Sequence, residues 1–179
     1  TSKITDYPLS PNQISIAVLF IAAFSGLIIS MEGYFFLVLG ALLAQLSSIL
    51  DGCDGELARL KLLESKFGGW FDQVLDRYGD LFILTGLTFH TYFIHKTLTV
   101  FFIGFIAVGG KIILSYTAFT YDSLVSTHNS FRIGRDIIIF IILIGAVLNI
   151  PYITLAVLAF IMNAEVCKRL WTLKDKLDY

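Results

Sequence analysis

Charged residues are scarce in this chain of 179 residues. Lysine, arginine, aspartate and glutamate make up 15% of it, whereas a soluble domain carries about a quarter. Hydrophobic residues make up 56%. The formal net charge is −1, so bulk charge indicates no polyanionic partner, and no nucleic-acid partner is expected. This composition argues against a soluble domain and indicates a protein that lies in a lipid membrane.

Cysteine is nearly absent as well. Cys53 and Cys167 stand far apart and form no CxxC pair, which argues against a zinc knuckle and a disulfide framework. Both are expected to be buried apolar thiols. The sequence also lacks internal repeats, low-complexity tracts and an N-terminal signal-peptide pattern. We expect a single domain over residues 1–179, which can be part of a longer chain because it starts at Thr1 rather than Met.

Long apolar segments fill most of the chain. Six of them approach the ~20 residues that a helix needs to cross a bilayer. They cover roughly residues 13–30, 34–60, 68–92, 97–120, 132–149 and 151–171. The sequence therefore predicts an all-α polytopic membrane protein with six transmembrane helices.

The basic residues predict how these helices are oriented. With a cytoplasmic N-terminus, only Lys96 falls in an outside loop, and the inside loops and tails hold a large excess of lysine and arginine. The inside set is Lys3, Arg59, Lys61, Lys66, Arg132, Arg135, Lys168, Arg169, Lys174 and Lys176. We therefore expect an integral protein of the cell membrane with both ends in the cytoplasm.

Four carboxylates cluster near the predicted cytoplasmic ends of the second and third segments. Asp51 and Asp54 are three residues apart, and Asp72 and Asp76 are four apart, so each pair shares one face of a helix. Charge inside a membrane segment is costly and usually marks function. Hard divalent cations such as Mg²⁺ or Mn²⁺ prefer such oxygen ligands. The alternative is that these acids lie on helix surfaces and pair with neighbouring arginines and lysines.

The same acids stand inside a longer pattern, D-G-x-x-A-R-x8-G-x-x-x-D-x-x-x-D, preceded by a further aspartate. Its fixed positions are Asp54, Gly55, Ala58, Arg59, Gly68, Asp72 and Asp76, and the leading acid is Asp51. This pattern resembles the signature of the CDP-alcohol phosphotransferases, integral membrane enzymes that transfer a phospho-alcohol from a CDP-alcohol to an acceptor hydroxyl and release CMP.

The resemblance implies a role for each of these residues. It implies a two-metal site with Mg²⁺ or Mn²⁺ in a polar cavity that faces the cytoplasm, with Asp76 either a ligand or the general base. It also implies a homodimer, because the family commonly forms one. The implied metal ligands are Asp51, Asp54, Asp72 and Asp76, and the implied CDP-binding residues are Gly55, Ala58, Arg59 and Gly68.

Further buried charges lie beyond the signature. Asp80 continues the face of Asp72 and Asp76, and Lys111 falls in the middle of the fourth segment. Lys111 either pairs with Asp80 or reaches a phosphate on the acceptor. Together with Arg132 and Arg135 it could form a basic pocket for a phosphorylated acceptor, although both arginines also fit the role of topology anchors. No partner for Glu165 is evident from the sequence.

The substrates are predicted from a short segment in which this chain differs from many members of the family. Many phospholipid-making members carry an Arg-Ala pair shortly after a tyrosine in the fourth helix, whereas this chain reads Ser115-Tyr116-Thr117-Ala118. The departure favours the branch that joins CDP-inositol to inositol phosphate, as in di-myo-inositol phosphate phosphate synthesis. The alternative is a phospholipid synthase that uses CDP-diacylglycerol. An alternative from another class is a cation transporter, which would need acids spread along the membrane depth.

Overall fold

Six helices account for nearly all of the described chain. The computed structural model describes residues 11–60, 65–124 and 134–177. The helices are α1 Pro11–Ser30, α2 Tyr34–Leu60, α3 Lys66–His95, α4 Leu98–Leu124, α5 Arg135–Val147 and α6 Pro151–Leu177. The predicted all-α class is confirmed, and each predicted segment coincides with one helix. The fifth begins three residues later than predicted, after the extended backbone of Gly134, and the sixth runs six residues longer.

Three of these helices are long and apolar enough to cross a membrane. The spans are Asn12–Ser30, Tyr34–Gly52 and Leu98–Ala118, among the residues that the structure describes. The other three helices are shorter or less apolar than the predicted spans. α5 has 13 residues, which corresponds to about 20 Å, less than the ~30 Å of a bilayer core. The first half of α3 carries Asp72, Asp76, Arg77 and Asp80.

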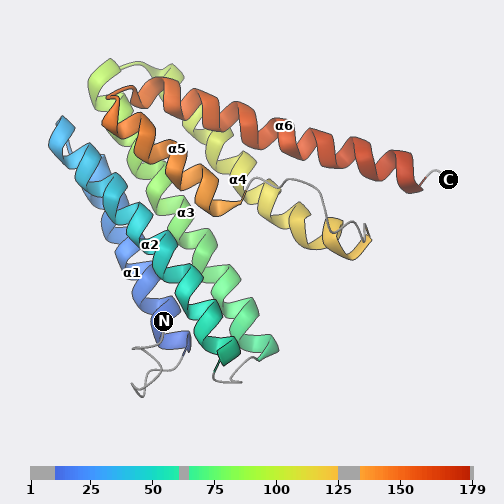
Figure 1. The fold of residues 1–179 in the computed structure, drawn as a ribbon. Helices are drawn as coiled ribbons and strands as arrows, with labels where there is room; N and C mark the ends of the chain where they lie inside the picture. Colours follow the sequence, from blue (N-terminus) through green and yellow to red (C-terminus); the bar gives the residue numbers. More distant parts are fainter. Residues whose placement is uncertain (1–10, 61–64, 125–133, 178–179) are drawn as a thin grey trace.

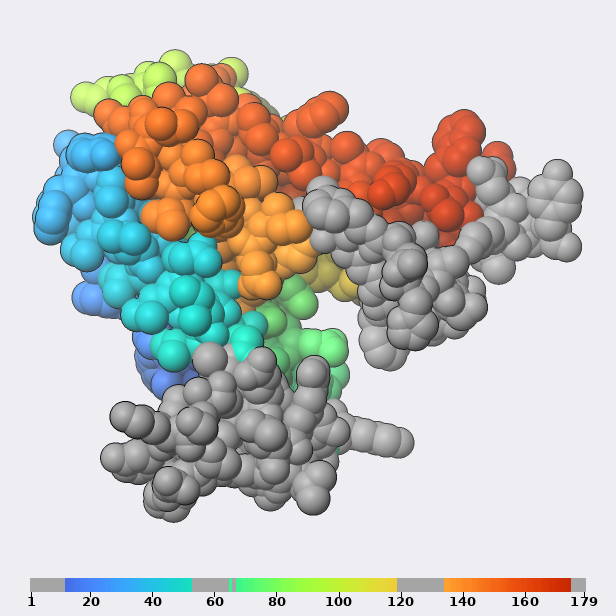
Figure 2. All heavy atoms as spheres, viewed as in Figure 1, coloured from blue at the N-terminus to red at the C-terminus, as the bar shows by residue number. Residues whose placement is uncertain are grey.

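The helices form two groups that meet along α5 and the second half of α3. α1 packs closely against α2 and α3, and α4 packs against α6 (Figure 1). α5 lies between α2 and α6 on the face seen in Figure 2. Buried apolar side chains from all six helices make one continuous core. α5 contributes Ile138, Ile139 and Ile142 to it, so this short helix is fixed on its apolar side.

A close backbone contact joins α1 to α3. Gly26 and Gly86 face each other so closely that a Cβ added to Gly86 would lie 2.1 Å from the Gly26 carbonyl oxygen. Small residues allow such approaches between membrane helices, where packing rather than a hydrophobic driving force holds helices together. The contact holds the acid-bearing α3 against α1.

The surface is rich in large apolar side chains. Phe102, Phe105 and Phe160 are each at least 70% exposed, and Phe20 is 69% exposed. Such a surface is costly in water and suits lipid. Cys167 is also exposed, so the expectation that it is a buried thiol was wrong. It lies on the outer face of α6 next to Lys168, while the neighbouring Val166 packs inward.

Candidate metal centre and its basic neighbours

Three of the predicted acids converge between α2 and α3. Asp51 comes from α2, and Asp72 and Asp76 come from successive turns of α3. One carboxylate oxygen from each residue lies within 4.8 Å of the other two. All three side chains are partly buried. Carboxylates this close repel one another unless positive charge lies between or beside them.

The chemistry of this group fits a hard divalent cation. It offers only oxygen donors, which Mg²⁺ and Mn²⁺ prefer. Asp51 Oδ1 is buried and lies 3.0 Å from Arg135 Nη1. A carboxylate offers about four lone-pair sites, so this single contact leaves Asp51 able to bind a further cation. Asp72 is held from a third helix, because the Ser15 hydroxyl of α1 donates a hydrogen bond to it.

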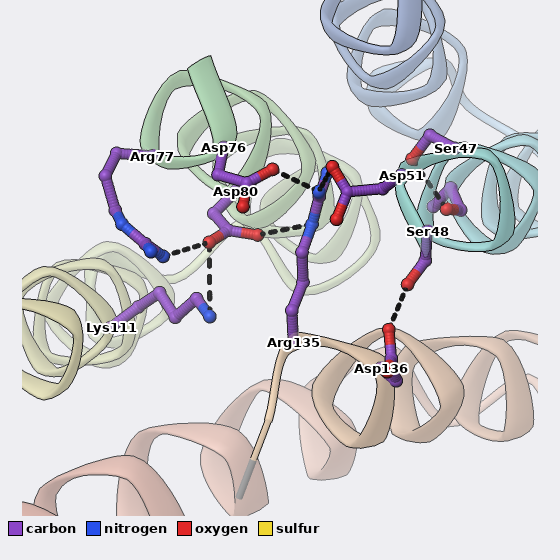
Figure 3. A network of polar contacts seen from close by, with 10 residues as sticks. Ser47, Ser48, Asp51, Asp76, Arg77, Asp80, Lys111, Arg135 and Asp136 are labelled. Carbon is purple, nitrogen blue, oxygen red and sulfur yellow. Dashed lines mark hydrogen bonds and ion pairs between the residues drawn. The ribbon is translucent and has the colours of Figure 1, made fainter. Parts of the chain in front are cut away.

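Arg135 provides the positive charge closest to this group. Its guanidinium extends from the first turn of α5 and makes ion pairs with Asp51 and Asp76 (Figure 3). Its Nε lies 3.4 Å from Asp80 Oδ1. Only 10% of the Arg135 side chain is exposed. One guanidinium therefore joins α5 to both acid-bearing helices.

Asp80 is the meeting point of three cations. Its Oδ2 lies 3.1 Å from Lys111 Nζ on α4 and 3.3 Å from Arg77 Nη1 on α3, while Arg135 approaches Oδ1 (Figure 3). The predicted Asp80–Lys111 pair is thus confirmed. Asp80 is 5% exposed, and the space that it shares with Arg77 and Lys111 is too small to hold a water molecule.

A second contact fixes the start of α5 beside the acids. Ser48 Oγ donates a hydrogen bond of 2.6 Å to Asp136 Oδ1, which ties α2 to α5 next to Arg135. Asp136 also stands in the first turn of α5, where a negative charge is favoured by the helix dipole. Sequence analysis did not assign a role to either residue, because a contact between distant residues leaves no local pattern.

Gly68 lies where α3 begins, close to the start of α1. The Ser65 side chain caps the helix by accepting a hydrogen bond of 2.9 Å from the Gly68 N–H. A Cβ at Gly68 would lie 3.0 Å from Ser65 Oγ and 3.3 Å from Asn12 Oδ1. The missing side chain therefore lets the capped end of α3 approach α1 closely.

Several predicted residues lie outside the described set. The backbone of α2 runs to Leu60, but the side chains of the signature positions on its last two turns are not described. These positions are Asp54, Gly55, Ala58 and Arg59. Arg132 lies outside the described residues altogether. The roles given to these five residues stay predictions.

Sequence analysis missed the surroundings of Glu165. Glu165 Oε1 lies 3.6 Å from Arg169 Nε, and Oε2 lies 3.4 Å from Lys168 Nζ. Arg169 is buried and donates a hydrogen bond of 2.8 Å to the Leu114 carbonyl of α4. The i,i+4 spacing of Glu165 and Arg169 is the signal that could have revealed this pair.

Arg77, Lys111 and Arg135 form a basic cluster around Asp80. A groove of about 450 Å³ opens beside it, between α3 and α4. It reaches Arg77, but neither the three converging acids nor Arg135 line it. Its lining is Trp70, Gln73, Val74, Arg77, Ile112, Ser115 and Tyr116. The groove is separate from the acids, and the polar cavity predicted around them stays a prediction.

Known proteins resemble this chain in sequence and in architecture. The chain is 36% identical over 174 residues to a bifunctional IPC transferase and DIPP synthase of Rubrobacter xylanophilus, which covers 94% of this chain and 38% of that protein. The protein of the same name from Archaeoglobus fulgidus is 37% identical over 149 residues, covering 79% of this chain and 28% of that protein. The chain thus spans only 28% to 38% of the length of these curated relatives.

A solved structure has the same fold. The crystal structure of the Mycobacterium tuberculosis phosphatidylinositol phosphate synthase with CDP-DAG bound superposes with a TM-score of 0.81 at 20% identity, covering 96% of this chain and 89% of that one. The family model described as CDP-alcohol phosphatidyltransferase matches residues 9–168, a range that contains every residue of the acid and basic clusters. This chain therefore belongs to the CDP-alcohol phosphatidyltransferase family.

Proposed function

We propose that this chain transfers a phospho-alcohol from a CDP-alcohol to an acceptor hydroxyl and releases CMP. The observation that carries the proposal is the convergence of Asp51, Asp72 and Asp76 from two helices within 4.8 Å. Family membership and the names of the relatives, which are transferases and synthases, support it. The favoured substrates are CDP-inositol and an inositol phosphate.

The acids divide into ligands and a base. Asp51, Asp54 and Asp72 would hold two divalent cations, Mg²⁺ or Mn²⁺, and Asp76 would face the acceptor. When bound, these ions would neutralise the pyrophosphate and the departing phosphate. Asp76 accepts the proton of the acceptor hydroxyl, because a high-pKa alcohol attacks phosphorus poorly until it loses that proton. The acceptor oxygen bonds to the β-phosphorus, and the bond from that phosphorus to the bridging oxygen breaks, so that CMP leaves with this oxygen.

The remaining signature residues would hold the nucleotide. Gly55 and Ala58 leave the backbone of α2 open to a close ligand, and Arg59 offers a bidentate donor to a phosphate. Gly68 stands at the start of α3, where the positive end of the helix dipole favours an anion. These four residues would thus form the CDP pocket.

Lys111, Arg132 and Arg135 would bind the acceptor through its phosphate. A phosphate dianion near several carboxylates needs compensating cations. Lys111 and Arg135 come from different helices yet both contact Asp80, so the two charges lie near one point. This proximity supports a shared anionic ligand, and an arginine fork suits phosphate by donating two parallel hydrogen bonds.

In this proposal the protein lies in the cell membrane as a six-helix bundle with the acids facing the cytoplasm, although the 13 residues of α5 are shorter than the bilayer core. The charged half of α3 can lie at membrane depth because its charges are paired across helices rather than exposed to lipid. Residues 1–179 would act as one catalytic domain, and two copies would form a homodimer. Substituted-cysteine labelling of Lys96 and Lys174 in intact membrane vesicles tests the orientation, since only one of these positions should be reached from outside.

One competing activity has specific support. The fold is shared with a synthase that was crystallised with CDP-DAG, so a phospholipid synthase that uses CDP-diacylglycerol is the second candidate. A cation transporter is a weaker alternative, because among the described residues the converging acids lie at one place and are paired with cations.

Release of CMP from a panel of substrates tests the proposal. The purified protein is incubated with Mg²⁺ and with CDP-inositol or CDP-diacylglycerol, each with inositol phosphate, inositol or glycerol phosphate. We expect the fastest release with CDP-inositol and inositol phosphate. Faster release with CDP-diacylglycerol would assign the chain to lipid synthesis, and no release with any pair would overturn the proposed transfer.

A further inference from the structure

We infer that Asp80 is a positioning residue that holds Lys111 and Arg135 in place for the phosphate of the acceptor. The inference rests on the proposed function, and it concerns an acid that is not part of the signature. Asp80 is the one described residue that contacts a cation on each of α3, α4 and α5. It therefore decides where these cations lie relative to each other.

The contacts of Asp80 argue against a role as a further metal ligand. Both of its oxygens are engaged, Oδ2 by Arg77 and Lys111 and Oδ1 by Arg135. A metal ion would have to displace three positive charges from a nearly fully buried carboxylate. Asp51, Asp72 and Asp76 form the converging group without it. Asp80 therefore interacts with the cations of the basic cluster and is not a metal ligand.

Asp80 also attracts the Arg135 guanidinium from its Nε side, as an ion pair without a hydrogen bond. It contacts the Nε edge, while the Nη1 end lies against Asp51 and Asp76. The neighbouring Gly79 leaves room for this arrangement, since a Cβ there would lie 3.3 Å from Arg135 Nη2. With one edge held, the terminal nitrogens stay at the border between the acids and the basic cluster.

The charge balance requires a carboxylate at this point. Lys111 is 7% exposed and pairs with Asp80, so its ammonium would be a costly buried charge without this acid. Arg135 keeps Asp51 and Asp76 as partners, but it would lose the acid on its Nε side. Asp80 compensates one of the two charges of Arg77 and Lys111, so one positive charge remains beside it to receive a phosphate.

Steady-state kinetics of Asp80 variants test the inference, with each substrate varied in turn. Asp80→Asn keeps the shape and removes the charge. We expect the acceptor KM to rise about tenfold or more, which is the loss of one charge-assisted contact, while the KM of the CDP-alcohol changes less than twofold. Asp80→Glu keeps the charge and should recover part of the acceptor affinity. Glu165→Gln, another buried acid paired with cations, measures what loss of a buried ion pair does by itself.

A double variant separates positioning from simple charge compensation. If Asp80→Asn fails to fold, Asp80→Asn with Lys111→Gln removes the uncompensated ammonium together with its partner. Lys111→Gln alone is the reference, because loss of Lys111 by itself weakens acceptor binding. A purely structural role of Asp80 predicts that the double variant folds and has the acceptor KM of Lys111→Gln. The positioning role predicts a higher acceptor KM in the double variant than in Lys111→Gln, because Arg135 also loses its contact with Asp80.

The outcomes distinguish this inference from the proposed function. A normal acceptor KM in Asp80→Asn, or equal acceptor KM values in the double variant and Lys111→Gln, overturns the inference alone when the unaltered protein releases CMP. An equal rise of both KM values also overturns it, because the effect would then not be specific to the acceptor. Absence of CMP release by the unaltered protein overturns the proposed function and this inference together.

Discussion

Arg135 Nη1 lies 3.0 Å from Asp51 Oδ1, so a cation from α5 faces the acid that leads the signature on α2. The same guanidinium contacts Asp76 of α3. The acid group and the basic cluster are therefore one continuous network, with Arg135 at the boundary. A substitution in the acid group should therefore affect the basic cluster, and a substitution in the basic cluster should affect the acid group.

Removal of divalent cations should abolish CMP release. Asp51, Asp72 and Asp76 lie too close to stay ionised together at low cost without added positive charge, and Arg135 supplies only one. We expect chelation by EDTA to stop CMP release and Mg²⁺ or Mn²⁺ to restore it. Undiminished release in excess chelator would show that the two-metal site is wrong.

Asparagine substitutions should separate the ligands from the base. Asp51→Asn, Asp54→Asn and Asp72→Asn should weaken binding of the cation and the CDP-alcohol. Asp76→Asn should lower kcat by about 100-fold or more, the usual contribution of a general base, and retain much of the binding. Isothermal titration with Mn²⁺ and with the CDP-alcohol provides the binding data. Loss of Mn²⁺ binding in Asp76→Asn would make this residue a ligand and not the base.

Neutralising Arg135 should alter both sides of the boundary. In Arg135→Gln we expect the acceptor KM to rise, because a phosphate donor is lost. We also expect Mn²⁺ to bind several-fold more tightly, because Asp51 and Asp76 lose a competing cation.

Arg132→Gln is the matched comparison for Arg135→Gln. If Arg132 binds the acceptor, its variant raises the acceptor KM and leaves Mn²⁺ affinity unchanged. Weaker Mn²⁺ binding in Arg135→Gln would mean that Arg135 orders the acids and does not compete with the ion. Unchanged acceptor KM in both variants, with poor membrane insertion, would identify them as topology anchors.

The sequence predicted the helices and part of the site because both leave a local trace. Apolar runs located all six helices within a few residues at most ends. The spacing of Asp72 and Asp76 predicted a shared face, and the signature connected them with Asp51 on another helix. The Asp80–Lys111 pair was one of two alternatives for a charge that is costly in an apolar segment, and the structure contains this pair.

The remaining contacts depend on how distant segments meet. Nothing in the sequence near Asp136 indicates Ser48, which lies 88 residues away, and nothing near Leu114 indicates Arg169. The contacts of Arg135 with Asp51 and with Asp80 depend on the position of α5 between α2 and α6. The sequence alone did not predict that position. Periodicity assigns a residue to a face of its helix, but it does not determine which other helix that face will meet.

The contact between Gly26 and Gly86 gives a prediction about stability. In Gly86→Ala the new Cβ would lie 2.1 Å from the Gly26 carbonyl oxygen, a backbone atom that cannot rotate away, so α1 and α3 must move apart. Overpacking of this kind costs about 1–3 kcal/mol. We expect a lower melting temperature in detergent and reduced CMP release, since α3 carries Asp72 and Asp76. Gly109→Ala on α4 is the control, because a Cβ there meets nothing within 4 Å and should leave stability unchanged or slightly higher. Equal melting temperatures for the two variants would show that the α1–α3 contact adapts without cost and does not hold the acid-bearing helix in place.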